Sequence, residues 1–333
     1  MSRFDLKLIN GKTVQEILYS ASDKIYEKVK NAYLLHENNQ THNPGSYFLG
    51  SLNNPGSRII ALPAYVGSTP DCMGIKWIGS NPKNIKSGFP RASALIILND
   101  TDTMMPLCCM EGSIISATRT SVSAVLATEV LNNGVREAES LGIIGNGFIP
   151  ETIVNYFHQY GWKFDNIFLY DLDKKRSEQF SGKNDYYSYE ILASHEELIR
   201  KSDITLFTTT VPKPYFDDVL LLGHNPLLLN ISLRDIGTEV ILSSQNIVDD
   251  IDHVLNANTS VHLAQQKIGN ATFIDDTLAN VMTSDVELRN NKPKIFSPMG
   301  LGVLDIALAE LVYQEAVEIG NYINIEDFTL TGQ

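Results

Sequence analysis

The 333-residue sequence contains only three cysteines, Cys72, Cys108 and Cys109, and two of them are adjacent. Neighbouring cysteines rarely pair and no Cys-x-x-Cys motif is present, so we expect free thiols in a reducing compartment. The first five residues lack the apolar run of a signal peptide, and no stretch is long and apolar enough to predict a transmembrane helix. These absences together favour a soluble, cytoplasmic protein.

Positive charge is also scarce, because 26 Lys and Arg residues face 39 Asp and Glu residues, for a formal net charge of −13. An acidic chain repels phosphate backbones and anionic lipids, so nucleic acid and membrane surfaces are not expected partners. The seven histidines are scattered without metal-ligand spacing, so we predict no metal site. The length and a hydrophobic content of 43% suit a globular protein of two domains.

The first part of the chain has the pattern of an α+β domain. Apolar residues at three- and four-residue spacing from Val14 to Ala32 predict one amphipathic helix, and a loop is expected from Asn38 to Ser57. Asn99-Asp100 is typical of a hairpin turn, and Ser113–Leu131 is expected to be a helix. The predicted strands of a mostly antiparallel sheet are Arg58–Leu62, Met73–Ile78, Ala92–Leu98 and Met105–Met110.

From Glu139 onward, strands and helices alternate, which predicts a parallel sheet with helices on both faces. A terminal helix over Val303–Ile319 is expected to return to the first domain, so we place the domains at 1–130 with 306–333 and at 131–305. The alternating segments are Leu141–Ile144, Pro150–Tyr160, Asn166–Tyr170, Lys174–Phe180, Ile204–Thr208, Leu227–Ile231, Asn246–Val248 and Lys294–Phe296.

A strand, a glycine turn and a helix start follow one another between Leu141 and Glu151. Gly145 permits the tight turn, and Gly147 has no side chain to keep a pyrophosphate from the backbone. The helix N-terminus then offers N–H groups and a positive dipole end to that pyrophosphate. Pro150 replaces the third glycine of the usual fingerprint, which a first helical turn tolerates. The turn therefore predicts a dinucleotide site.

Acidic and hydroxyl side chains follow the neighbouring strands. Asp171 ends the next strand, where a carboxylate accepts hydrogen bonds from the adenosine ribose and repels a 2′-phosphate, so NAD is favoured over NADP. Thr208 and Thr209 follow a third strand, although threonine is also simply common in strands. The fold class predicted is α/β, a Rossmann-type NAD-binding domain plus a discontinuous α+β domain. The predicted cofactor-binding set is Gly145, Asn146, Gly147, Phe148, Ile149, Asp171, Thr208, Thr209 and Met299.

Basic residues in apolar segments of the first domain need an anionic partner, because an uncompensated buried cation is costly. Arg58 and Lys76 lie in predicted strands and Arg119 in a predicted helix, while Arg91 precedes a strand and suits the surface equally well. Arginine offers a planar fork to a carboxylate, and lysine offers a point charge. These residues are candidates for substrate binding; alternatively, each pairs with a protein carboxylate or reaches water.

Three sequence segments, in this order, resemble the ornithine cyclodeaminase/mu-crystallin family: Gly74-Ile75-Lys76-Trp77, Ala117-Thr118-Arg119-Thr120 and Ile144-Gly145-Asn146-Gly147. The similarity extends from about Arg58 to the terminal helix. Asn230-Ile231-Ser232-Leu233-Arg234-Asp235 resembles the segment that ends in the catalytic aspartate of the family, which makes Asp235 a candidate acid–base residue. Cyclodeaminases proper carry a glutamate where this chain has Ile60, which argues against ornithine cyclisation.

Further sequence segments resemble the branch of this family that oxidises N-(2-amino-2-carboxyethyl)-L-glutamate. Among them are Arg91-Ala92-Ser93, Val248-Asp249-Asp250 and Pro298-Met299-Gly300. The resemblance implies a homodimer formed by the substrate-binding domain, with the active site between the domains. It implies oxidative cleavage to 2-oxoglutarate and 2,3-diaminopropionate for siderophore or peptide-antibiotic synthesis, beside a cysteine-synthase-like pathway enzyme.

The three carboxylates of such a substrate would suit Arg58, Lys76, Arg91 and Arg119. Lys76 would also orient a carboxylate or the attacking water, so it stands with Asp235 as a candidate catalytic residue. Two alternatives stay open: an ornithine cyclodeaminase or another amino-acid dehydrogenase of the family, and a mu-crystallin-like binding protein without enzymatic activity.

Overall fold

The computed structural model describes residues 4–54, 56–183, 185–283 and 286–329. The chain divides into two compact units, residues 1–119 with 301–333 (unit 1) and residues 120–300 (unit 2). The predicted domains met at 130/131 and 305/306, whereas the units divide at 119/120, inside a helix, and at 300/301. The sequence pattern places a boundary where a helix ends, but this helix belongs to both units. The predicted ends at residues 1 and 333 lie outside the described residues.

Unit 1 contains a mixed sheet in the order β16-β1-β7-β6-β5-β4-β2, with β3 also paired to β4. Neighbouring strands run antiparallel except for β1 and β7, which run parallel. The strands are β1 (Phe4–Ile9), β2 (Thr41–His42), β3 (Tyr47–Gly50), β4 (Arg58–Val66), β5 (Cys72–Ser80), β6 (Ala92–Asn99), β7 (Pro106–Glu111) and β16 (Ile323–Thr329).

Two expectations for this unit were wrong in detail. The segment 38–57 is not all loop, because β2 and β3 pair with β4 there; β3 keeps its side chains exposed, so no apolar alternation marks it. The helix predicted from Val14 to Ala32 is two helices, α1 (Gly11–Ser20) and α2 (Ser22–Glu37). Ala21 separates them with φ −107° and ψ 29°, outside the helical region.

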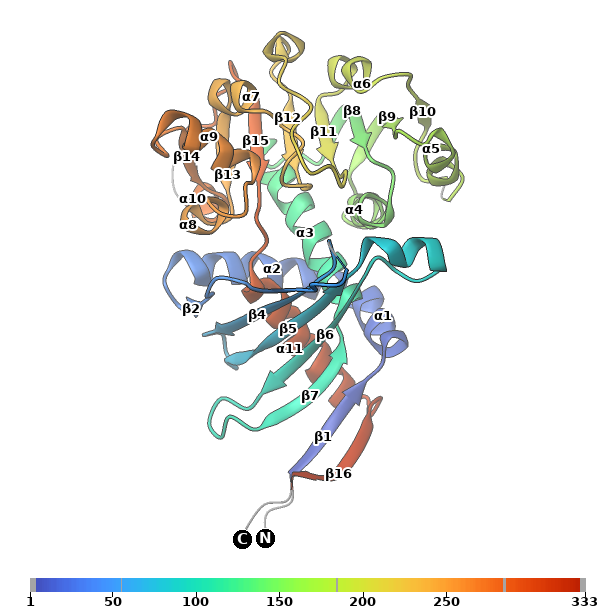
Figure 1. Ribbon diagram of the computed structural model, residues 1–333, viewed down its shortest axis with the longest axis vertical. Helices are drawn as coiled ribbons and strands as arrows, with labels where there is room; N and C mark the ends of the chain where they lie inside the picture. Colours follow the sequence, from blue (N-terminus) through green and yellow to red (C-terminus); the bar gives the residue numbers. More distant parts are fainter. Residues whose placement is uncertain (1–3, 55, 184, 284–285, 330–333) are drawn as a thin grey trace. The chain divides into compact units, whose positions relative to one another are not determined.

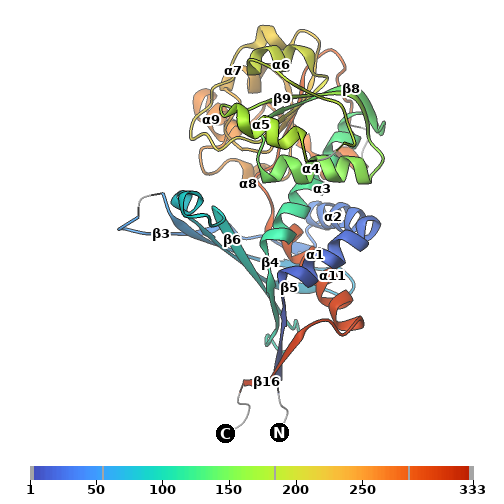
Figure 2. The same cartoon turned by 90° about the vertical axis from the view of Figure 1, so that its right-hand side faces the viewer.

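The sheet of unit 1 has one covered face. Helices α1, α2 and α11 (Gly302–Glu318) lie on the same side of it (Figure 2). Side chains alternate between the two faces of a strand, so Lys76 on β5 points the same way as its cross-strand partners Leu62 and Ile96, toward α11. Trp77 and Leu95 are cross-strand partners on the other face, where they are 43% and 49% exposed.

Helix α3 (Ser113–Leu131) has the predicted bounds, but it contradicts the expectation that no segment could cross a membrane. By length and composition alone this helix is long and apolar enough to do so. Two thirds of its most apolar stretch is buried inside the protein, which is the environment of a core helix. The apolar surface of α3 is thus accounted for by packing.

Unit 2 is a parallel sheet in the order β10-β9-β8-β11-β12-β15-β13-β14, flanked by helices (Figure 1). Its strands are β8 (Glu137–Ile144), β9 (Lys163–Tyr170), β10 (Tyr189–Ile191), β11 (Ile204–Phe207), β12 (Leu227–Asn230), β13 (Gln245–Val248), β14 (Ile274–Thr277) and β15 (Lys294–Ser297). Its helices are α4 (Phe148–Gln159), α5 (Lys174–Ser181), α6 (His195–Lys201), α7 (Thr238–Ser243), α8 (Ile251–Val254), α9 (Ser260–Ile268) and α10 (Leu278–Thr283).

The order of the strands reverses between β8 and β11. From β8 the chain moves outward to β9 and β10, and then returns to β11 on the other side of β8. In parallel sheets of this kind, ligands bind at the carboxyl ends of the strands where this reversal occurs. This topology confirms the predicted Rossmann-type fold and directs attention to the residues after β8 and β11.

Candidate functional site

The glycine turn follows β8 at this reversal. Gly145 has φ +88°, and a Cβ there would lie 3.0 Å from the backbone carbonyl of Thr208 at the end of β11. Gly147 precedes α4, and among the described residues, its two chain neighbours aside, no atom lies within 4 Å of the position its Cβ would take. One glycine therefore allows the strand ends to approach each other, and the other leaves the start of α4 open for a ligand.

Asp171 at the end of β9 bonds directly to this turn. Its Oδ2 accepts a 2.8 Å hydrogen bond from the backbone N–H of Asn146, and its Oδ1 accepts one of 2.9 Å from Asp173. The Asn146 side chain is buried, where its Oδ1 accepts a 2.7 Å bond from the Ser177 hydroxyl. The carboxylate and the turn thus hold each other in place, an arrangement that suits the ribose and pyrophosphate of a dinucleotide.

The two threonines after β11 use their hydroxyls within the protein. Thr208 Oγ1 donates to the carbonyl oxygen of Gly145 at 2.7 Å, which shapes the glycine turn. Thr209 Oγ1 donates to Oδ1 of Asp235 at 2.6 Å. Of the other residues predicted to contact the cofactor, Phe148 is 63% exposed and Ile149 is half-buried at the start of α4. Their contact with a cofactor stays a prediction.

Asp235 follows β12 and is completely buried. Burial raises the pKa of its carboxyl group, while hydrogen bonds from Thr209 and Tyr215 act in the opposite direction. Leu233, two residues earlier, has φ +75°, a left-handed conformation that is uncommon for a residue other than glycine. A buried carboxyl group with a raised pKa beside a strained loop has the properties of an acid–base residue.

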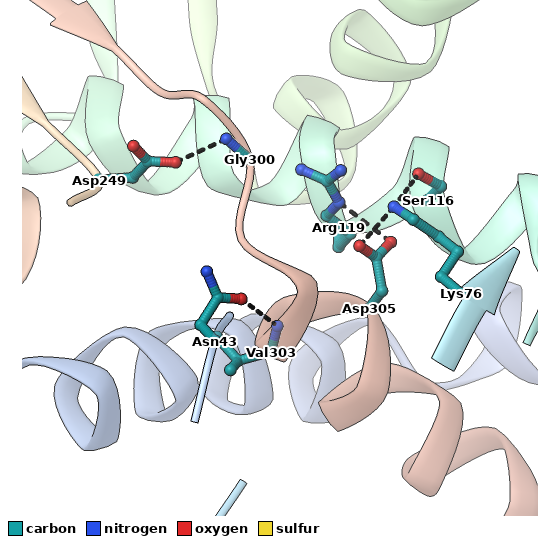
Figure 3. A network of polar contacts seen from close by, with 8 residues as sticks. All are labelled: Asn43, Lys76, Ser116, Arg119, Asp249, Gly300, Val303 and Asp305. Atoms are coloured by element: carbon teal, nitrogen blue, oxygen red, sulfur yellow. Dashed lines mark hydrogen bonds and ion pairs between the residues drawn. The ribbon is translucent and has the colours of Figure 1, made fainter. Parts of the chain in front are cut away.

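Met299, the last residue of the predicted cofactor set, lies after β15 and is half-buried. Its backbone N–H donates to Oδ1 of Asp249 at 3.0 Å. The backbone N–H of Gly300 donates to Oδ2 of the same carboxylate at 2.7 Å (Figure 3). Asp249 is 2% exposed and was not among the site residues predicted from the sequence. Its carboxylate fixes the backbone that carries Met299.

In unit 1, four polar side chains lie together and are here called the cationic cluster: the buried Lys76 and Asp305 and the partly buried Ser116 and Arg119 (Figure 3). Lys76 Nζ donates to Oδ2 of Asp305 at 2.5 Å and to Oγ of Ser116 at 3.0 Å. Arg119 Nε donates to Oδ1 of Asp305 at 3.1 Å. Lys76 and Arg119 therefore do pair with a protein carboxylate, which was the alternative to substrate binding that the sequence left open.

The charges of the cluster shift the pKa values of its members. Desolvation lowers the pKa of Lys76 to about 8; the charge of Asp305 opposes this shift and that of Arg119 adds to it. Burial alone would raise the pKa of Asp305, but the charges of Arg119 and Lys76 outweigh it and hold that pKa below its usual value. Asp305 is therefore ionised at neutral pH, and Lys76 titrates within the range in which enzymes work.

The other two basic candidates lie around Ser80. Arg58 is the cross-strand partner of Ser80, and Arg91 Nη1 donates to the Ser80 hydroxyl at 3.0 Å. Both arginines are exposed, and Arg58 lies 5.9 Å from the centroid of the Phe48 ring. Lys76 is four residues from Ser80 on the same strand and faces the same way, since side chains alternate along a strand. One face of the sheet thus carries both groups of cations.

Sequence reasoning missed Asp305, which is the anion of the cationic cluster. One signal was available: Asp305 is an acidic residue among the apolar positions of the terminal helix, where a buried charge needs a partner. The pairing itself could not be deduced, because Lys76 and Asp305 are 229 residues apart in sequence.

A model of the ornithine cyclodeaminase/mu-crystallin family matches residues 12–320. The N-((2S)-2-amino-2-carboxyethyl)-L-glutamate dehydrogenase of Staphylococcus aureus is 29% identical over 283 residues, 80% of this chain and 82% of the relative. The Thermococcus litoralis Delta(1)-pyrroline-2-carboxylate reductase, solved with NADH and L-proline, is 24% identical, with a TM-score of 0.85 over 96% of this chain and 100% of its own. An archaeal alanine dehydrogenase dimer with bound NAD is 21% identical, with a TM-score of 0.84 over 97% and 99%.

Proposed function

The chain belongs to the ornithine cyclodeaminase/mu-crystallin family, and from this premise we propose that it is an NAD-dependent dehydrogenase of an amino-acid CH–NH bond. Its proposed substrate is N-(2-amino-2-carboxyethyl)-L-glutamate, which it cleaves oxidatively to 2-oxoglutarate and 2,3-diaminopropionate. The observation that carries the proposal is the placement of four cations, Lys76, Arg119, Arg58 and Arg91, on or beside one face of the unit 1 sheet. The Staphylococcus aureus relative acts on this substrate.

The glycine turn and Asp171 support NAD as the cofactor. Gly147 leaves room for the pyrophosphate at the start of α4, and Asp171 at the end of β9 is the acid that suits the ribose hydroxyls. A 2′-phosphate would meet the negative charge of Asp171, which favours NAD over NADP. When bound, NAD supplies the acceptor for the hydride that leaves the substrate.

The cations support a substrate with several carboxylates. The cationic cluster contains two positive charges and one negative charge, so it retains one positive charge for one carboxylate. Arg58 and Arg91 add two more positive charges around Ser80, and the planar guanidinium of arginine can donate two parallel hydrogen bonds to a carboxylate. The proposed substrate has three carboxylates, which this set of charges matches.

The reaction removes a hydride from the glutamate Cα and a proton from the secondary amine, which leaves a C=N bond. Water then adds to the carbon of this imine, and the C–N bond breaks to release 2,3-diaminopropionate as the amine and 2-oxoglutarate as the ketone. Asp235, with its raised pKa, accepts and returns the protons of these steps. Lys76 orients a substrate carboxylate or the attacking water.

The exposed face of the unit 1 sheet supports a homodimer. Trp77 and Leu95 lie side by side on this face and are about half exposed, which is costly for large apolar side chains unless a partner covers them. A second copy of the chain would bury this face.

The proposed reaction further suggests that a cysteine-synthase-like enzyme makes the substrate, and that 2,3-diaminopropionate enters a siderophore or a peptide antibiotic.

Turnover assays separate this proposal from its alternatives. The proposed enzyme forms NADH and 2-oxoglutarate in equal amounts from N-(2-amino-2-carboxyethyl)-L-glutamate. An ornithine cyclodeaminase would release ammonia from ornithine without net NADH, and a binding protein of the mu-crystallin kind would turn over neither substrate. Either of these two results would contradict the proposal.

A further inference from the structure

Asp305 is an ionised carboxylate on α11, in a stretch where every residue from Gly302 to Val312 is buried. It lies in the first turn of α11, and the residues on both sides of it, Leu304 and Ile306, are completely buried. Replacing a buried ion pair by apolar residues of similar size often stabilises a protein, so stability alone does not explain the presence of this charge. The role of this charge must therefore lie in its interactions with the neighbouring cations.

Asp305 binds both members of a pair of cations, one through each of its oxygens. Oδ2 accepts from Lys76 on β5, and Oδ1 accepts from Arg119 on α3 (Figure 3). The cross-strand neighbours of Lys76, Leu62 and Ile96, are apolar, and the anion that pairs with its ammonium is Asp305. Without Asp305 the two cations would repel each other in a buried site.

The hydrogen bonds to Asp305 leave donors for a further anion. A lysine ammonium has three N–H donors, and Asp305 and Ser116 accept two of those of Lys76. Asp305 engages Arg119 through Nε, which leaves the two terminal nitrogens that form a fork with a carboxylate. The Arg119 side chain is 13% exposed and that of Lys76 is 1% exposed, so Arg119 is the more accessible of the two.

We propose that Asp305 is a positioning residue, which holds Lys76 and Arg119 so that the cationic cluster binds one carboxylate of the substrate. This inference rests on the proposed function and adds the residue that organises its substrate site. Asp305 itself does not touch the substrate. Its hydrogen bond to Nε orients the guanidinium of Arg119. Its negative charge leaves the cluster with a single net positive charge, which favours the binding of one carboxylate rather than two.

The test replaces Asp305 by Asn, which keeps the shape and removes the charge. Asp305→Asn is expected to raise the KM for the proposed substrate about 10- to 100-fold, with a smaller change in kcat. This is the size of effect expected when misplaced Lys76 and Arg119 lose their charge-assisted hydrogen bonds to the substrate. The Kd for NAD should be unchanged. Asp305→Glu should recover part of the lost affinity. An unchanged KM in folded Asp305→Asn would overturn the proposal.

A matched control removes another buried carboxylate from the same helix. Glu310 on α11 is 4% exposed and forms an ion pair with Lys28 at 2.6 Å rather than with a member of the cationic cluster. Glu310→Gln should lower thermal stability without a change in substrate KM. If both variants raise KM equally, the effect of Asp305→Asn belongs to helix packing and the positioning role fails.

Two measurements without turnover separate this proposal from the proposed function. Calorimetric binding of a carboxylate panel (glutamate, proline and 2-oxoglutarate) should weaken in Asp305→Asn and not in Glu310→Gln. NMR titration of the lysine Cε signals, with Lys76 assigned by its loss in Lys76→Arg, should show a lower Lys76 pKa in Asp305→Asn. If the wild type binds carboxylates in this way but does not oxidise the substrate, only the proposed function fails. If the wild-type protein binds none of these carboxylates, the positioning role is overturned.

Discussion

The backbone N–H of Asn146, inside the glycine turn, donates a 2.8 Å hydrogen bond to the carboxylate of Asp171 on the neighbouring strand. This bond links the turn proposed to bind the pyrophosphate to the acid proposed to bind the ribose. The two parts of the proposed cofactor site are therefore one rigid unit, and a change in Asp171 should affect both.

Replacing Asp171 by Ala should weaken NAD binding and relax the rejection of NADP, because the 2′-phosphate no longer meets a carboxylate. Titration of both cofactors, followed by intrinsic fluorescence, measures the two Kd values. Asp173→Ala is the matched control, since Asp173 caps α5 two residues away. If Asp171→Ala keeps the NAD/NADP preference of the wild type, the acid that selects NAD lies elsewhere.

Replacing Arg119 by Ala should raise the substrate KM about 10- to 100-fold, because a charge-assisted bond to a carboxylate contributes roughly 1.5–3 kcal/mol. Arg119→Lys should recover little, because an ammonium cannot form the fork of a guanidinium. Steady-state kinetics provide the measurement, with the surface variant Lys12→Ala as the control. A KM equal to that of the wild type would exclude contact between Arg119 and the substrate.

Lys76 should make carboxylate binding depend on pH. Its pKa is lowered to about 8, so its charge is present below that pH and is lost as the pH rises through it. Binding of 2-oxoglutarate, which has no amine to titrate, should weaken above about pH 8. In Lys76→Arg the charge persists and the weakening should disappear. The same pH dependence in both proteins would assign it to another group.

Thr209 should tune the acidity of Asp235. The hydrogen bond from its hydroxyl lowers the pKa of a carboxyl group that burial raises, so Thr209→Val should raise that pKa further. If ionised Asp235 is the base, activity is present above its pKa and lost below it, and the acid limb of the kcat/KM profile should move to higher pH. Asp235→Asn should lower kcat about 100-fold or more while NAD still binds. An acid limb at its wild-type position in Thr209→Val would contradict the assignment.

The exposed face of the unit 1 sheet should hold two copies together. Trp77→Glu should yield monomers, because it places a charge at an apolar interface, whereas Tyr19→Glu on the solvent side of α1 should not. Sedimentation velocity distinguishes the two species. Dimers in both variants would place the dimer interface elsewhere.

The parts of the fold that were predictable are those with a strong local signal. The turn at Gly145 and Gly147 and the alternation of strands and helices around it predicted a Rossmann-type fold, which the sheet order confirms. Helix α3 was predicted at both ends, and an Asn-Asn-Gly sequence marks its C-terminal end. The break at Ala21 was not predictable, since the apolar periodicity continues across it and alanine is a good helix former.

The site was predictable only where its residues are near each other in sequence. Asp171 and the glycine turn lie within one βαβ unit, and their spacing alone suggested that they meet. The pairing of Asp305 with Lys76 and Arg119 depends on how α11, β5 and α3 pack together, which no local pattern records. Burial of a charge signals that a partner exists, but it does not say which residue the partner is.

The most direct test of the whole account is the rate of NADH formation by the wild-type protein with N-(2-amino-2-carboxyethyl)-L-glutamate and NAD, measured beside ornithine and proline. The account predicts NADH and 2-oxoglutarate in equal amounts from the first substrate, with a kcat/KM far above that for the other two. Ammonia release from ornithine without net NADH, or oxidation of proline in preference to the tricarboxylate, would contradict it.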